Sequence, residues 1–122
     1  KILGISVDKP AREFCETISE IANAGANLLH LETQFQPEEI LVNDDYCAAG
    51  YGVLTPAEKE AILLFARHEA ILLDPVYTGR AAAGLIDLIR QGFFKTNENV
   101  LFWPTGGTPA LFAEPYRSEL AK

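Results

Sequence analysis

The first segment whose residue types could do chemistry follows an apolar run. Residues 74–79 (DPVYTG) offer the phenol of Tyr77 and the hydroxyl of Thr78, which could stand at the mouth of a pocket. A phenol placed there can orient a group or assist proton transfer. The same pattern is also typical of a plain strand-to-helix turn, in which Asp74 accepts hydrogen bonds from free backbone donors. Both interpretations stay open on the pattern alone.

A second segment, residues 105–109 (TGGTP), predicts a glycine turn that leads into a helix. At Gly106 and Gly107 the backbone N–H groups could approach a ligand, and the dipole of the following helix would favour negative charge. A tight turn without any ligand is equally consistent with the pattern. The pattern alone also does not say which anion would bind.

Other polar groups lack the spacing that catalysis or metal binding requires. His30 and His68 have no companion at ligand spacing, so surface or capping roles are favoured over metal binding. Asp44 and Asp45 are adjacent and would face opposite ways in an extended stretch. No serine-hydrolase, phosphate-loop or zinc-protease motif is present. None of the lysines has an apolar neighbourhood that would activate its amine; they are Lys1, Lys9, Lys59, Lys95 and Lys122.

Composition narrows the function classes further. The 122 residues are 48% hydrophobic and 22% charged, which predicts one folded domain rather than a disordered chain. The net charge of −7 would repel a polyanion, so we expect no nucleic acid as a partner. No apolar run approaches the ~20 residues of a membrane span, so we expect no membrane association.

The two cysteines, Cys15 and Cys47, have no CxxC spacing, and the side of a helix on which Cys15 falls favours a buried thiol. No signal peptide is visible, which favours the cytoplasm. The chain has no methionine and opens directly into an apolar run, so we expect a piece of a longer polypeptide.

The elements that must position these groups alternate along the chain. Short apolar runs predict strands at residues 2–7, 70–73 and 100–103, and a weaker one at 40–42. Apolar residues at helical spacing predict a helix from about Ala11, which Gly25 would end or bend. The capping box of Thr55 and Glu58 predicts a helix to about His68, and a largely enclosed helix is expected from about Gly79 to Gln91.

Continuously apolar strands alternating with helices indicate an α/β fold: a mostly parallel sheet in three layers, with helices on both faces. Ligands of such sheets bind beyond the carboxyl ends of the strands. Three segments are expected to meet there, namely residues 6–8, 74–79 and 104–108.

Four segments in order give this sequence a family resemblance: residues 50–56 (GYGVLTP), 71–81 (ILLDPVYTGRA), 84–89 (GLIDLI) and 101–113 (LFWPTGGTPALFA). Together they closely resemble the C-terminal third of the D-cysteine desulfhydrase and 1-aminocyclopropane-1-carboxylate (ACC) deaminase family. The likeness extends from Ile5 to Ala113. Those enzymes use pyridoxal 5′-phosphate and have the fold of the tryptophan synthase β subunit (fold type II). The resemblance implies that residues 1–122 are a single α/β segment, part of the large domain of a longer enzyme.

The resemblance also implies roles for particular residues. Tyr51 and Tyr77 match tyrosines near the substrate and cofactor, and are the implied catalytic groups. Thr78 and Thr105 match positions around the pyridine ring of the cofactor, and the turn of Gly106 and Gly107 adjoins them. The Schiff-base lysine and the phosphate-cradling loop belong to the N-terminal portion, so this chain alone is expected to be inactive.

Two of those positions bear on the substrate. The ACC deaminases carry an acidic residue where Thr78 stands and a leucine where Thr105 stands, so the two threonines resemble the desulfhydrase branch. The implied reaction is an α,β-elimination on a small amino acid that yields pyruvate, ammonia and sulfide. The sequence departs from the family at Pro104, where His is usual, at Arg80, where Lys is common, and at Glu114, where an aromatic residue is expected; the tail from there to Lys122 diverges.

The partners implied are therefore a small amino-acid substrate, the missing N-terminal portion of the same enzyme and a second copy in a homodimer. Two alternatives remain beside the desulfhydrase. One is an ACC deaminase-like enzyme. The other is a free-standing, non-catalytic α/β binding module, which would be a monodisperse monomer with a covered sheet.

Overall fold

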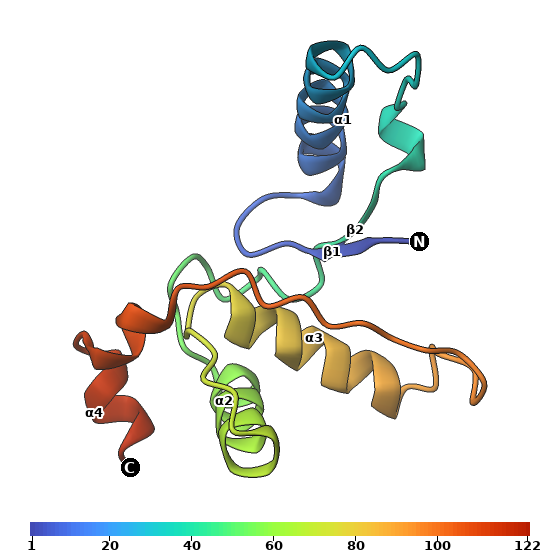
Figure 1. Ribbon diagram of the computed structural model, residues 1–122. Helices are drawn as coiled ribbons and strands as arrows, with labels where there is room; N and C mark the ends of the chain where they lie inside the picture. Colours follow the sequence, from blue (N-terminus) through green and yellow to red (C-terminus); the bar gives the residue numbers. More distant parts are fainter. The chain divides into compact units, whose positions relative to one another are not determined.

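The computed structural model describes residues 1–122, which form two compact units (Figure 1). The first comprises Lys1–Ala48 and the second Ala49–Lys122. Each unit is described below by itself. No helix in either unit is both long and apolar enough to cross a membrane.

The first unit is a strand–helix–strand arrangement. Strand β1 (Leu3–Ile5) pairs in parallel with β2 (Leu41–Asn43), with Gly4 opposite Val42. Helix α1 (Ala11–Leu28) and the short 3₁₀ helix η1 (Pro37–Glu39) connect them. A helical crossover is what joining two parallel strands requires, so both strands predicted in this unit are confirmed as a parallel pair.

Helix α1 does not end at Gly25, contrary to one of the two predicted outcomes. It continues to Leu28, and the N–H of Leu29 still bonds the Gly25 carbonyl at 3.0 Å. The helix begins where the backbone N–H of Ala11 donates to the Asp44 carboxylate at 2.6 Å. One glycine costs a helix only about 1 kcal/mol relative to alanine, so it does not by itself end a helix.

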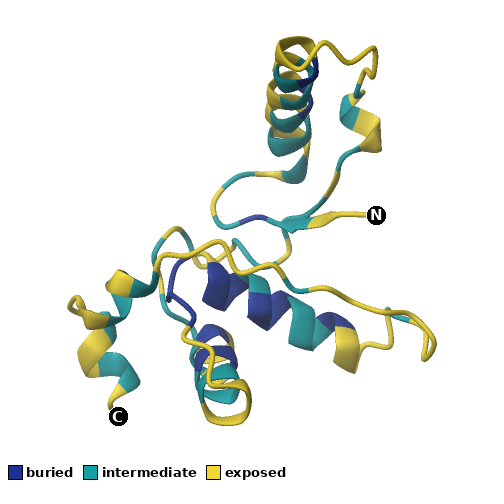
Figure 2. Cartoon of the chain, viewed as in Figure 1, coloured by how far each residue is buried: buried dark blue, intermediate teal, exposed yellow.

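The second unit is built on two packed helices, α2 (Pro56–Glu69) and α3 (Thr78–Arg90), followed by the 3₁₀ helix η2 (Thr108–Phe112) and α4 (Tyr116–Leu120). Figure 2 shows the buried residues gathered on α2, on α3 and on the turn that precedes α3. The buried cluster comprises Ala61, Ile62, Leu73, Ala82 and Ala83. Phe65 and Phe102 pack beside it with ring centroids 5.2 Å apart.

Close approach explains one glycine of α3. A Cβ added at Gly79 would lie 2.6 Å from the Asp74 carbonyl oxygen and 3.1 Å from Ile62, so any side chain would push α3 away from both. The helix boundaries predicted for α2 and α3 are confirmed to within a residue or two. Helix α3 is only partly enclosed: Ala82 and Leu88 are buried, whereas Ile89 is exposed.

The strands predicted at residues 70–73 and 100–103 are not present. Both segments are irregular, although Leu73 is fully buried and Phe102 is half-buried. A strand is defined by hydrogen bonds to a neighbouring strand, and no strand of this unit pairs with either segment. The structure thus has a two-stranded parallel sheet and helices, an α/β composition without the expected larger sheet.

Candidate functional site

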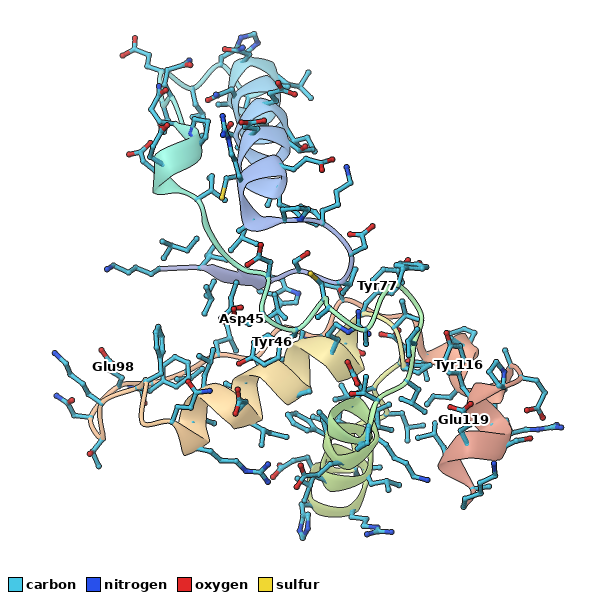
Figure 3. All side chains as sticks on the ribbon, turned by 180° about the vertical axis from the view of Figure 1, so that it is seen from behind. Asp45, Tyr46, Tyr77, Glu98, Tyr116 and Glu119 are labelled. Atoms are coloured by element: carbon cyan, nitrogen blue, oxygen red, sulfur yellow. The ribbon has the colours of Figure 1, made fainter.

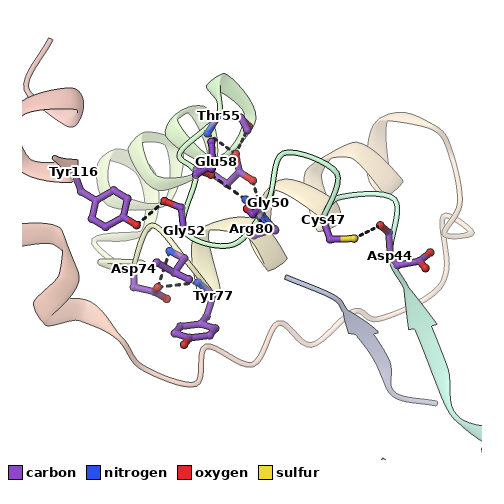
Figure 4. A network of polar contacts seen from close by, with 12 residues as sticks. Asp44, Cys47, Gly50, Gly52, Thr55, Glu58, Asp74, Tyr77, Arg80 and Tyr116 are labelled. Carbon is purple, nitrogen blue, oxygen red and sulfur yellow. Dashed lines mark hydrogen bonds and ion pairs between the residues drawn. The ribbon is translucent and has the colours of Figure 1, made fainter. Parts of the chain in front are cut away.

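Asp74 organises the turn before α3. Its side chain is fully buried and accepts hydrogen bonds from the backbone N–H groups of Val76, Tyr77 and Thr78 at 2.8, 2.8 and 2.6 Å. A carboxylate in this position satisfies free donors at the helix start and interacts favourably with the helix dipole. The predicted role of Asp74 as an acceptor for free backbone donors is therefore confirmed, although no strand precedes the turn. This turn fixes where Tyr77 stands (Figure 4).

The phenols of Tyr51 and Tyr77 meet through a direct hydrogen bond between their hydroxyl groups. The ring centroids are 5.9 Å apart and the rings are inclined at 67°. Both side chains are about half exposed, at 56% for Tyr51 and 47% for Tyr77. The structure thus brings together two phenols that are 26 positions apart in sequence, and leaves both open to a ligand.

Thr78, the residue after Tyr77, is buried and its hydroxyl is already bonded. The hydroxyl donates to the Asp74 carboxylate at 2.7 Å and accepts from the Asp74 backbone N–H at 2.8 Å. A hydroxyl has one proton and two lone pairs, so Thr78 keeps one lone pair and can only accept a further hydrogen bond. Its predicted contact with a pyridine ring stays a prediction, now limited to that of an acceptor.

The glycine turn lies directly on Asp74. A Cβ added at Gly107 would lie 2.7 Å from the Asp74 Cγ, and Gly107 has a φ of 89°. Thr105 and Gly106 are exposed beside it. The helix that follows is only the short 3₁₀ helix η2, so the helix-dipole argument for an anion is weaker than the sequence suggested. Residues 74–79 and the glycine turn do converge, whereas residues 6–8 belong to the other unit.

A buried ion pair that the sequence analysis did not predict supports the loop that carries Tyr51. Arg80 is fully buried and donates from Nε to Glu58 Oε1 at 2.8 Å. The Glu58 carboxylate also accepts from the Thr55 backbone N–H at 2.9 Å, as its capping box predicts. Arg80 continues to the carbonyls of Gly50 and Val53. The signal in the sequence was an arginine on the apolar helix α3.

Several influences set the ionisation of Glu58. Burial acts to raise the pKa of its carboxyl, but hydrogen bonds from Thr55 and from Arg80 outweigh burial and lower the pKa below its ordinary value. Glu58 is therefore a charged partner for the guanidinium at neutral pH.

The lysines of this unit are placed elsewhere. Lys59 donates from Nζ to the Glu119 carbonyl at 2.6 Å. Lys95 follows the far end of α3, whose 13 residues span about 20 Å, and Glu98 marks that end in Figure 3, opposite Tyr77. Across the chain, no cluster of three or more His, Cys, Asp or Glu side chains could hold a metal ion.

Comparison with solved structures finds proteins that are similar to this chain. No family model matches the chain. A crystal structure of an ACC deaminase homologue is similar to it, with a TM-score of 0.77 and 32% sequence identity. The match covers 98% of this chain and 34% of that protein, so the chain spans about a third of its length. This similarity supports the resemblance to the ACC deaminase family that the sequence motifs indicate.

Proposed function

We propose that this chain forms one wall of the active site of a pyridoxal-phosphate-dependent lyase that acts on a small amino acid by α,β-elimination, as D-cysteine desulfhydrases do. The observation that carries the proposal is the hydrogen-bonded pair of Tyr51 and Tyr77 beside the glycine turn. Both phenols are implied catalytic groups on sequence grounds, and they come from separate segments. The similarity to an ACC deaminase homologue supports the same class of enzyme.

The donor set fits one side of such a cofactor. Thr78 retains an acceptor lone pair, which suits a protonated ring nitrogen, and Thr105, Gly106 and Gly107 provide an exposed hydroxyl and exposed backbone beside it. Pyridoxal phosphate, when bound, supplies the electron sink for the elimination. The cofactor-binding residues proposed here are Thr78, Thr105, Gly106 and Gly107.

The tyrosines are proposed to handle protons. Two phenols that share a hydrogen bond can accept a proton at one oxygen and release one from the other, which suits a reaction that removes the Cα proton and protonates a leaving group. For D-cysteine the balance is one amino acid and one water giving pyruvate, ammonia and hydrogen sulfide. Tyr51 and Tyr77 are both exposed enough to reach a substrate placed above them.

The remainder of a longer polypeptide is proposed to supply what this chain does not place at the site. That remainder would contribute the Schiff-base lysine and the phosphate-cradling loop. It would also contribute strands that pair with residues 70–73 and 100–103, which would complete a three-layer, mostly parallel sheet. We further propose that the whole enzyme is a cytoplasmic homodimer.

The experiment that tests the function is a substrate comparison on the polypeptide that carries this chain together with the lysine-bearing portion. We expect D-cysteine to give pyruvate and sulfide. ACC is the second candidate substrate, because the structural neighbour is an ACC deaminase homologue; it would give 2-oxobutanoate and ammonia without sulfide. Turnover of ACC alone would replace the desulfhydrase assignment, and turnover of neither would overturn the proposed function.

Substitution of the two phenols makes the first testable prediction. Tyr51→Phe and Tyr77→Phe should each lower kcat by about a hundredfold or more, since each removes a proton-transfer group. The double variant should be no slower than the worse single variant, because the two phenols act as a unit. Steady-state rates with D-cysteine provide the measurement, and thermal unfolding of each variant controls for folding. Additive losses in the double variant would contradict a shared role.

The inactivity of the chain alone has a separate test. The isolated chain is mixed with pyridoxal phosphate, reduced with borohydride and examined by mass spectrometry. We expect no lysine of this chain to be modified selectively and no pyruvate from D-cysteine. A single modified lysine accompanied by pyruvate formation would overturn the inactivity.

A further inference from the structure

We propose that Arg80 is the residue that positions Tyr51 against Tyr77, by holding the backbone on both sides of Tyr51. The catalytic importance of that contact rests on the function proposed above, whereas the positioning itself does not. Arg80 would then be a positioning residue, since it acts through Tyr51.

The contacts of Arg80 bracket Tyr51. Nη1 donates to the Gly50 carbonyl at 3.0 Å (Figure 4). Nη2 donates to the Val53 carbonyl at 2.9 Å. One guanidinium therefore fixes the residue before Tyr51 and the second residue after it. The planar fork of an arginine holds two separate acceptors at fixed angles, whereas a lysine ammonium is a single point charge on a flexible stem.

The orientation of the guanidinium is itself fixed from the opposite side. Nε donates to Glu58, and Glu58 is held at the start of α2 by the backbone N–H of Thr55. Both members of this pair are buried, Arg80 completely. A buried charge pair that only stabilised the fold would not need to contact this loop, but here Nη1 and Nη2 donate to two carbonyls of the loop that carries Tyr51.

A third anchor comes from a distant segment. The hydroxyl of Tyr116, on α4, donates to the Gly52 carbonyl at 2.6 Å. The carbonyls of residues 50, 52 and 53 are thus all held, while the Tyr51 side chain stays more than half exposed. The loop is fixed through its backbone, and its side chain is presented to Tyr77.

Both phenols are thus positioned by residues at the start of α3. Tyr77 precedes the first residue of α3 and its N–H is held by Asp74, and Arg80 follows in the first turn. Tyr77 is placed directly by that turn and Tyr51 indirectly through Arg80. A rigid helix end that positions both side chains can hold a direct contact between the two phenols in place.

The test compares Arg80→Lys with the matched control Arg90→Lys. Arg90 lies on the same helix and forms a bidentate pair with Glu60, but that pair is exposed. The 122-residue chain is labelled with ¹³C at tyrosine Cζ, and each signal is assigned by Tyr→Phe substitution. In the wild type and in Arg90→Lys, Tyr51→Phe should shift the Tyr77 signal. In Arg80→Lys, the Tyr77 signal should already be shifted, and adding Tyr51→Phe should change it no further.

Chymotrypsin gives a second readout on the same samples, because it cleaves after tyrosine. Loss of two charged hydrogen bonds should raise the cleavage rate between Tyr51 and Gly52 at least about tenfold in Arg80→Lys. Tyr116→Phe, which removes one anchor, should give a smaller rise. Arg90→Lys should leave the rate unchanged, with cleavage sites identified by mass spectrometry.

Each outcome decides the proposal. If Arg80→Lys keeps the wild-type response of Tyr77 to Tyr51→Phe, Arg80 only stabilises the fold and the positioning role is wrong. If Arg80→Lys does not fold, the double variant Glu58→Gln/Arg80→Met removes both buried charges together, and the same two readouts apply to it. A coupled tyrosine pair in a complete protein that shows no lyase activity would reject the proposed function and leave the positioning role standing.

Discussion

At the scale of single residues, the candidate site depends on a carboxylate that is fully buried. Asp74 is buried, holds three backbone donors of the turn and carries Gly107 directly against its side chain. The turn that places Tyr77 and the turn that places Thr105 are therefore in contact through one residue. A side chain at Gly107 would act on both.

Gly107→Ala should therefore destabilise the second unit. The added Cβ would come within 2.7 Å of Asp74 Cγ, and alanine also resists a φ of 89°. We expect a loss of about 2–3 kcal/mol in the free energy of unfolding, measured by urea denaturation. Gly106→Ala is the matched control, because Gly106 shares the turn and a positive φ but has open space around it. The control should lose about 1 kcal/mol. Equal losses at the two positions would show that Gly107 does not pack on Asp74.

At the scale of elements, the start of α3 joins the candidate site to a buried ion pair. Thr78 and Arg80 lie in its first turn; Thr78 bonds the turn that holds Tyr77, and Arg80 reaches the start of α2 through Glu58. The start of α2 is capped by the hydrogen bond from the Thr55 backbone N–H to Glu58. Charge on Glu58 is thus part of the contact between the two helices, and this contact should depend on pH.

Acid should weaken the second unit through Glu58. Its pKa in the folded chain lies below the ordinary value, so the unfolded chain takes up the proton first as the pH falls. The stabilisation is complete above the ordinary carboxyl value of 4.5 and is lost as the pH drops through the lower folded value. Glu58→Gln should remove this acid dependence and cost about 3 kcal/mol at pH 7, because Arg80 is left without its charged partner.

Urea unfolding at a series of pH values measures this dependence. Glu60→Gln is the control: its pair with Arg90 is exposed and screened by solvent, so the acid dependence of the wild type should persist. An unchanged pH profile in Glu58→Gln would contradict the assigned role of the pair.

At the scale of the whole molecule, apolar side chains remain uncovered on segments that lack a partner strand. Leu101 is 81% exposed and Trp103 is 78% exposed, and Leu72 is also exposed on the other irregular segment. Exposed apolar residues clustered on extended backbone are typical of surfaces that another chain segment covers. The fragment hypothesis and the binding-module hypothesis differ here.

The isolated chain should self-associate if it is part of a larger enzyme. Size-exclusion chromatography with light scattering should detect oligomers whose mass rises with concentration. The double variant Leu101→Ser/Trp103→Ser should shift the chain toward monomer, because it removes apolar area from the uncovered segment. The control is Phe112→Ser, which removes an apolar side chain that is 69% exposed on η2. A monodisperse wild-type monomer would instead favour the free-standing binding module.

The sequence predicted the helices well because their signals are local. The capping box at Thr55 and Glu58 and the apolar spacing of α3 need no distant partner to be recognised. The strands at residues 70–73 and 100–103 were predicted from equally apolar runs, but strand structure needs a neighbour that this chain does not supply. The continuation of α1 past Gly25 was not predicted, because a glycine lowers helix propensity without necessarily ending a helix.

The sequence indicated which residues form the candidate site, but not the hydrogen bonds that hold them in place. Tyr51 and Tyr77 were identified from the family resemblance, and the structure brings their hydroxyls together. The carbonyl contacts of Arg80 could not be predicted, because Gly50 and Val53 offer only backbone atoms, whose positions no residue type reveals. The commitment of the Thr78 hydroxyl to Asp74 is hidden for the same reason.

The spacing of Tyr77, Thr78 and Arg80 at the beginning of α3 has an evolutionary consequence. One inserted residue would rotate everything after it by about 100° around the helix axis, so the guanidinium would swing off both carbonyls while the phenol stayed in place. Chain-length variation among natural homologues should therefore be absent between residues 74 and 80. Insertions and deletions should instead accumulate in the mostly exposed segment at residues 91–99.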